Sequence, residues 1–106
     1  MLLMGEYIMP KAHTIVEYEV INAASQAEHV PKLQAALAKA GGRSLVTPGG
    51  KVTSVDGAAP TTVNIIEWES LAQAIAFRES AAFKELAPLR EKSIRITRRY
   101  IVESGN

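Results

Sequence analysis

Three side chains at the ends of regular segments could carry chemistry. Glu67 ends an apolar run, where burial would raise its pKa and let it move protons. Arg43 follows two glycines and could hold a substrate carboxylate through two parallel hydrogen bonds. His29 lies beside an apolar helical stripe and could act as a base toward a bound substrate. The sequence therefore predicts a small-molecule site with Glu67 and His29 as catalytic residues and Arg43 as a substrate-binding residue.

Each of these residues also has a structural interpretation. Glu67 and Arg43 could form an ion pair, and such pairs also perturb pKa values. Arg43 could instead cap helix carbonyls, and His29 could be a half-exposed helical histidine without a chemical role. Both kinds of interpretation stay open for all three residues.

Four further residues complete the predicted substrate-binding set: Tyr18, Tyr100, Arg78 and Ser80. Tyr18 and Tyr100 lie on segments expected to be neighbouring strands, so their rings could line a pocket or pack in the core with satisfied hydroxyls. Arg78 could bind an anion or remain solvated. Ser80 could contact a ligand or cap a short helix.

Metal and cofactor chemistry has little support in the sequence. The chain contains no cysteine, which excludes disulfides, thiolate metal sites and cysteine nucleophiles. The two histidines do not combine with a carboxylate at metal-ligand spacing, and Gly49-Gly50-Lys51 lacks the glycine spacing of a phosphate loop. We predict no metal and no cofactor.

Charge and hydropathy limit the possible partners and the location. The 12 basic and 11 acidic residues give a net charge of +1, which provides no reason to expect nucleic acid or an anionic membrane as partner. No segment approaches the roughly 20 apolar residues of a membrane span. Residues 1–10 are predicted to be an N-terminal extension, whose apolar start is too short for a secretion signal. The expected location is the cytoplasm.

The pattern of residues predicts alternating strands and helices within a single domain, residues 11–105. β-Branched residues and alternation predict strands at residues 13–21, 43–47, 61–69 and 94–103, with 51–55 as an additional hairpin arm. Asn22 and Ser25 are helix-start residues for the first helix, and Ser25 with Glu28 fits a capping box. Ser70 with Gln73 fits another capping box, and Ser80 could start a further helix. Pro31 either kinks the first helix or begins its regular part, Gly41-Gly42 ends that helix, and Pro88 breaks or restarts the last segment.

This order, β-α-β-β-α-β, predicts the ferredoxin-like α+β fold, with an antiparallel sheet and both helical layers on one face. The other face needs a cover, because neither side of the strands is uniformly polar: Val16 and Tyr18 point one way, while Ile15, Glu17 and Glu19 point the other. A second copy of the chain is the simplest cover, so we expect a homodimer. The carboxylates on this face indicate a polar cavity between the two sheets.

Several short motifs, in order and spacing, resemble the domain-of-unknown-function family 1330 between Lys11 and Gly105. They are Gly41-Gly42-Arg43, Gly49-Gly50, Asp56-Gly57, Ile65-Ile66-Glu67-Trp68, Phe77 with Ser80, Pro88-Leu89-Arg90 and Ile101-Val102-Glu103. The resemblance implies a dimeric α/β barrel, in which two ferredoxin-like sheets face each other. Relatives in that superfamily include cofactor-independent monooxygenases, haem-degrading enzymes, muconolactone isomerases and dehalogenase-like proteins.

The chain departs from the family pattern at several positions. Asp56-Gly57 stands where the family has Glu-Gly, and Glu67-Trp68-Glu69 where it has Glu-Phe-Pro. His29 replaces a helical tyrosine, and another tyrosine is missing near Phe83. The loss of two phenol hydroxyls would change the polar contacts of a pocket. Two functions stay open: binding or transforming a small, anionic organic molecule by proton transfer or cofactor-independent oxidation, or a non-catalytic dimeric stress-response or scaffold module.

Overall fold

A computed structural model describes residues 9–105, and the predicted extension at residues 1–10 lies outside them except for Met9 and Pro10. The described strands form one antiparallel sheet in the order β2-β3-β1-β4. Their bounds are β1 Ala12–Val20, β2 Arg43–Ser44, β3 Thr62–Trp68 and β4 Ile94–Glu103. This arrangement confirms the predicted ferredoxin-like α+β fold.

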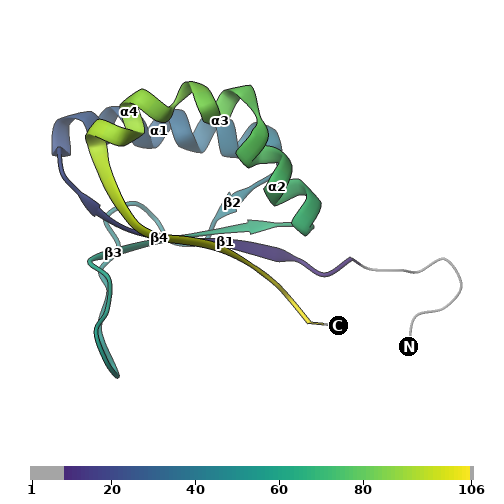
Figure 1. Cartoon of the computed structure of the whole chain (residues 1–106), viewed down its shortest axis with the longest axis horizontal. Helices are drawn as coiled ribbons and strands as arrows, with labels where there is room; N and C mark the ends of the chain where they lie inside the picture. The colour runs from purple at the N-terminus through teal and green to yellow at the C-terminus, as the bar shows by residue number, and fades with distance from the viewer. Residues whose placement is uncertain (1–8, 106) are drawn as a thin grey trace, which may run out of the picture.

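The helices form a single layer over one face of the sheet (Figure 1). Their bounds are α1 Ala23–Ala40, α2 Leu71–Glu79, α3 Ala81–Glu85 and α4 Ala87–Ser93. The second helical segment is therefore divided into α2, α3 and α4, with Ser80 and Leu86 at the two breaks. The opposite face of the sheet carries no helix of the described residues (Figure 1).

Of the two predicted helix-start residues of α1, the first is confirmed and the capping box at the second is wrong. Asn22, not Ser25, is the N-terminal cap, because its side-chain oxygen accepts a hydrogen bond from the Ser25 backbone at 3.0 Å. Pro31 lies inside α1 on its exposed side, so the regular helix does not begin there. The predicted stop is confirmed: Gly41 has a φ of 88°, a left-handed conformation that glycine adopts without steric cost.

Serine caps at the later helices are confirmed. The Ser70 hydroxyl accepts from the Gln73 backbone N–H, and the Ser80 hydroxyl accepts from that of Phe83, both at 3.2 Å. The Gln73 side chain in turn accepts from the Glu69 backbone N–H at 3.0 Å. These bonds satisfy N–H groups at helix starts that have no partner within the helix.

The connection between β2 and β3 differs from the prediction. β2 ends at Ser44 rather than Thr47, and residues 51–55 form no strand. Residues 45–61 instead form a long connection. It starts beside the sheet, where the Leu45 backbone N–H donates to the Ile65 carbonyl at 2.8 Å, and then extends on the side opposite the helices (Figure 1). We call this segment the arm.

Trp68 is the largest fully buried side chain of the core. Its ring centroid lies 5.3 Å from that of Phe77 on α2, so Trp68 packs beneath the second helical segment. Its Nε1 donates a hydrogen bond to Thr14 Oγ1 on β1 at 3.0 Å, so the indole N–H is satisfied inside the core. Leu37 of α1 and Ile66 of β3 complete the central contacts.

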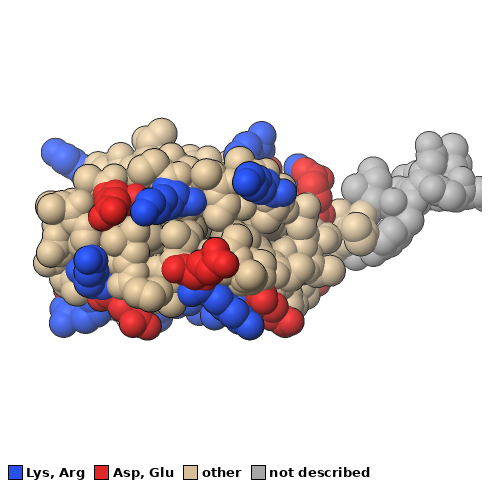
Figure 2. Space-filling model, turned by 90° about the horizontal axis from the view of Figure 1, so that it is seen from above, with Lys and Arg blue, Asp and Glu red and all other residues tan. Residues whose placement is uncertain are grey.

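Charges of both signs are interspersed over the helix-covered side (Figure 2). Among residues 9–105, no helix combines the length and the apolar character that crossing a bilayer requires.

Close packing between Gly42 and Trp68 gives a first prediction. A methyl group at Gly42 would meet the Trp68 ring at 2.7 Å, so Gly42→Ala must displace the indole. We expect a loss of about 1–3 kcal/mol in the free energy of unfolding, as for other overpacked cores. Urea unfolding measures it, with Gly105→Ala as control because nothing lies within 4 Å of that position. Equal stability of the two variants would contradict the packing.

Candidate functional site

A cavity of about 80 Å³ lies between the sheet and the helical layer. Even-numbered side chains of β1 and β3 form its floor, including Val16, Tyr18 and Ile66, because alternate strand residues point to the same face. The helices supply the roof, including His29 and Leu33 of α1. A single water needs about 10 to 15 Å³ on this measure, so the cavity has room for a small molecule or several waters.

His29 is the most deeply buried polar group of this cavity, with only 1% of its surface exposed. Its Nδ1 lies 3.0 Å from Gln26 Oε1, one turn earlier on α1. Its Nε2 is buried and has no hydrogen-bond partner in the part of the chain that the structure describes. A buried polar atom without a partner is rare, and it needs a physical explanation such as a ligand or a water.

The protonation state of His29 follows from these surroundings. Burial lowers its pKa, and the positive charge of Arg90 lowers it further, so the ring is neutral at neutral pH. An amide oxygen can only accept a hydrogen bond, so Nδ1 carries the proton that it donates to Gln26. Nε2 is then left with a free lone pair inside the cavity.

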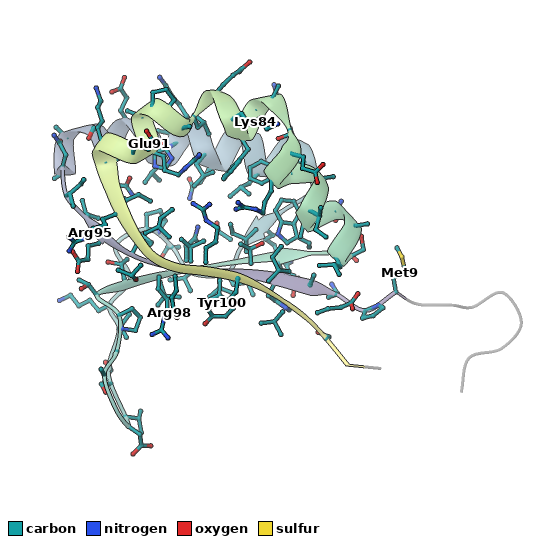
Figure 3. All side chains as sticks on the ribbon, in the orientation of Figure 1. Met9, Lys84, Glu91, Arg95, Arg98 and Tyr100 are labelled. Atoms are coloured by element: carbon teal, nitrogen blue, oxygen red, sulfur yellow. The ribbon has the colours of Figure 1, made fainter. Side chains whose placement is uncertain are left out.

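Three arginines line one end of the cavity and surround the Phe83 ring. Their guanidinium carbons lie 5.4 Å (Arg78), 4.1 Å (Arg90) and 5.6 Å (Arg99) from the ring centroid. We call them the arginine cluster. Figure 3 shows nitrogen-bearing side chains projecting into the space between the helices and the sheet.

Arg99 is the member of the cluster whose pKa is most affected. Burial lowers the pKa of its guanidinium to about 10, and the charges of Arg78 and Arg90 add to this effect. The pKa of Arg90 is also lowered, mainly by burial and partly by Arg78, although Glu91 acts in the opposite direction. Arg90 and Arg99 stay protonated at neutral pH, and the like charges of the cluster repel one another.

Tyr18 is a further titratable group of the cavity. Burial raises the pKa of its hydroxyl, so the phenol is neutral at neutral pH.

The open face of the sheet carries a separate set of charges. Glu67 accepts hydrogen bonds from Arg43, which faces it on β2, and from His13 Nε2, which lies 3.2 Å from Oε2. Lys11 Nζ lies 3.6 Å from Glu67 Oε1. Desolvation alone would raise the pKa of Glu67, but the bond to His13 and the charges of Lys11 and Arg43 outweigh it and lower the pKa. Glu67 is therefore held ionised.

Glu17 is the centre of a second group on this face. Arg98 Nε donates to Glu17 Oε1 and the Tyr100 hydroxyl donates to Oε2, both at 3.1 Å. The hydrogen bond to Glu17 raises the pKa of Tyr100, and burial and the Glu17 charge add to it against the opposing effect of Arg98. Arg95 pairs with Glu19 nearby. In Figure 3, Arg98 and Tyr100 project from the side of the sheet away from the helices.

The structure divides the predicted site residues between two faces. His29, Tyr18 and Arg78 line the cavity. The expectation that Glu67 and Arg43 share a site with His29 is wrong, because odd-numbered residues of β3 point away from the helices. Their ion pair was the structural alternative. A proton-transfer role for Glu67 stays a prediction, and it would belong to the open face.

Ser80 and Tyr100 also lie outside the cavity lining. The Ser80 hydroxyl is engaged at the helix break, where it donates to the Phe77 carbonyl at 2.6 Å and accepts from the Phe83 backbone N–H. Tyr100 lies on a strand adjacent to that of Tyr18, as expected, but on the opposite face. The sheet therefore separates the two rings that were predicted to share a pocket.

A β-bulge explains why Tyr100 was misplaced and Arg99 was missed. The pairing of β1 with β4 shifts between Glu17 and Tyr18, so Thr97 has no counterpart on β1. Before the bulge, the even-numbered side chains of β4 face the helices; after it, the odd-numbered side chains do. As a result, Ile96 and Arg99 both face the cavity.

No group of three or more His, Cys, Asp or Glu side chains within residues 9–105 could hold a metal ion.

Comparison with solved structures shows what this fold is similar to. RPA0582, a protein of unknown function from Rhodopseudomonas palustris, superposes with a TM-score of 0.69 at 11% identity, over 92% of this chain and 84% of that one. SnoaB, a cofactor-independent oxygenase from Streptomyces nogalater, superposes with a TM-score of 0.66 at 12% identity, over 92% of this chain and 95% of that one. At these identities the likeness shows the fold alone.

A search among curated proteins found no match. Residues 11–104 match the family described as "Domain of unknown function (DUF1330)", which covers nearly all of the residues that form the sheet and the helices. This chain therefore belongs to the DUF1330 family.

Proposed function

We propose that the protein binds a small organic molecule in the cavity between sheet and helices, and that His29 takes a proton from it. The observation that carries this proposal is the buried Nε2 of His29, which has no partner among residues 9–105 and belongs to the cavity lining. A substrate C–H or O–H group within hydrogen-bond distance would give this nitrogen the partner it lacks.

The proposed step is a proton abstraction. The proton passes from the substrate to Nε2, and its electron pair stays on the substrate as an enolate or phenolate. The product pair is an imidazolium and a delocalised anion, and the anion lies in a cavity that already holds three guanidinium groups. Fixed positive charge near a developing negative charge lowers the barrier to its formation.

Such an anion has two possible outcomes. Returning the proton at another atom gives an isomerisation, and transferring an electron to O₂ begins an oxidation that needs no cofactor. The fold that this chain shares with SnoaB, a cofactor-independent oxygenase, supports the second outcome. If the cavity only binds a ligand, the alternative of a non-catalytic module applies.

Deuterium exchange tests the proposed base. In D₂O, the protein should catalyse exchange at the acidic carbon of at least one member of a panel of 2-oxo acids and 1,3-diketones, followed by NMR. His29→Leu should lower that rate by about 100-fold or more, the usual contribution of a general base. Glu67→Gln is the matched control and should retain the rate, because Glu67 lies on the open face. An undiminished rate in His29→Leu, or no exchange with the whole panel, would contradict the proposal.

The lowered pKa of His29 gives a separate prediction for stability. In the unfolded chain the imidazole of His29 has a pKa of about 6.5, and in the folded chain its pKa is lower. As the pH falls, the imidazole is therefore protonated in the unfolded chain before it is protonated in the folded chain. The contribution of His29 is thus fully present above about pH 6.5 and is lost as the pH falls toward the folded pKa.

Urea unfolding of the wild type and of His29→Leu at pH 7.5 and 5.5 measures this effect. The wild type should lose more stability than the variant over that interval. Glu67 also has a lowered pKa, but its contribution is lost only below about pH 4.5, outside the interval. An equal loss in both proteins would show that His29 is not the group responsible.

We also propose that the open face of the sheet binds a second copy of this chain, as expected for a cytoplasmic homodimer. The charges on this face are already paired: Glu17, Glu19 and Glu67 each contact a basic side chain. The face therefore presents little net charge to an identical face. Its exposed apolar side chains, Leu45 and Val102, need a cover.

The arm adds support for this partner. Its middle part extends on the same side as the open face (Figure 1). A turn in this part is closed by a hydrogen bond of 2.6 Å from Ser54 Oγ to the Gly57 carbonyl. Val55 within that turn is 89% exposed, far more than the other exposed apolar side chains. A second protomer on the open face could cover both the sheet and this valine. In a two-fold dimer each of these contacts would occur once on each protomer.

Light scattering at graded concentrations tests the dimer. Val102→Asp places an unpaired charge on the open face and should raise the dimer dissociation constant at least tenfold. Ile75→Asp is the matched control, since Ile75 is an exposed apolar residue of α2 in the helical layer. A monomeric wild type at working concentrations, or equal weakening by both substitutions, would contradict the proposed interface.

A further inference from the structure

The arginines of this protein fall into two classes according to whether they have an acidic partner. On the open face, Arg43, Arg95 and Arg98 each pair with a glutamate. The arginine cluster of the cavity (Arg78, Arg90 and Arg99) forms no ion pair with any residue between 9 and 105. Positive charge on the cavity side of the sheet therefore has no carboxylate within ion-pair distance among these residues, and Glu91 acts on Arg90 only from farther away.

The geometry of the cluster concentrates this charge at one place. All three guanidinium groups lie around the single ring of Phe83, and Arg90 Nη1 also donates to the Phe83 carbonyl at 3.4 Å. Arg90 and Arg99 are partly buried, so water screens their repulsion less than it would at the surface. Each guanidinium has five N–H donors, and most of those in the cluster have no acceptor among the described residues.

We propose that the arginine cluster binds the anionic group of the substrate, a carboxylate attached to an apolar body. The inference deepens the proposed function and rests on it in placing the substrate within the cavity. An anion at this point would neutralise the repulsion among the guanidinium groups and accept the hydrogen bonds that they have free.

The remaining lining selects the rest of the ligand. No acidic side chain of the described residues lines the cavity, so nothing there competes with a bound anion. Away from the arginines the walls are mostly apolar, with Val16, Leu33, Ile66 and Ile96, although polar side chains such as Gln34 and Asn64 also line them. A planar guanidinium matches a carboxylate through two parallel hydrogen bonds, whereas inorganic phosphate would leave the apolar walls empty.

Thermal shift and titration calorimetry with benzoate, benzamide and inorganic phosphate, at equal ionic strength, test the proposal. Benzoate should raise the melting temperature, because a ligand that binds only the folded chain stabilises it. Arg99→Met should lower the affinity for benzoate at least tenfold. Arg98→Met changes only the open face and should leave that affinity within about twofold of the wild type. Benzamide or phosphate binding as tightly as benzoate would overturn the proposal, as would no binding of benzoate or equal weakening by both substitutions.

A measurement without ligand checks the charge imbalance. In dilute buffer, Arg99→Met should raise the melting temperature or leave it unchanged, since it removes repulsion and keeps an apolar stem of similar length. Arg98→Met should lower it, because Glu17 loses its ion-pair partner. If Arg99→Met lowered the melting temperature as much as Arg98→Met, the claim that the arginine cluster lacks an acidic partner would be overturned.

Failure here is distinguishable from failure of the proposed proton transfer. His29→Leu should bind benzoate within about threefold of the wild type, because the anion is held by the arginines. Benzoate binding that depends on Arg99, in a protein that catalyses no deuterium exchange, would overturn the role of His29 and support the anion site. Exchange that depends on His29, without benzoate binding, would overturn the anion site alone.

Discussion

The packing of Trp68 beneath the helical layer is the contact on which the rest of the structure depends. Its ring lies against that of Phe77, with the ring centroids 5.3 Å apart, and the centroids of the Phe77 and Phe83 rings are 5.2 Å apart. Phe83 is in turn the ring around which the arginine cluster is arranged. A continuous row of aromatic rings thus joins the core to the charged end of the cavity. Trp68 and Phe77 are buried and Phe83 is partly buried against them, so these rigid rings fix where the guanidinium groups lie.

The sheet is the boundary between two electrostatic environments. On its open face, Glu67 and Glu17 form ion pairs with arginine side chains, so opposite charges offset one another. On its covered face, a neutral histidine and three arginines without acidic partners among residues 9–105 share one apolar cavity. Burial lowers the pKa of His29 most, and the charge of Arg90, which adds to that effect, would also stabilise an anion formed from a substrate. A histidine without a partner and arginines without carboxylates are therefore complementary features of a site for an anionic molecule.

The candidate site was only partly predictable. His29, Tyr18 and Arg78 were identified because their residue types carry chemistry and they lie at the edges of apolar patterns. Arg99 was missed, and Tyr100 was assigned to the wrong face. In both cases the cause is the bulge at Thr97, which reverses the alternation of β4. An extra residue in one strand is a property of its pairing with another strand, and the residues of β4 alone do not encode it.

The sequence by itself determined the order of the elements and the fold, because hydrophobic periodicity, glycine stops and serine caps are local signals. It located the ends of β1, β3 and β4 to within one residue, but not the capping box of α1 or the end of β2, where a long arm replaces a hairpin. Only the tertiary structure decided which side chains meet. The partners of Glu67 come from β2 and from the start of β1, and the arginine cluster comes from α2, α4 and β4. Such contacts join residues far apart in the chain, so they depend on register and packing rather than on local pattern.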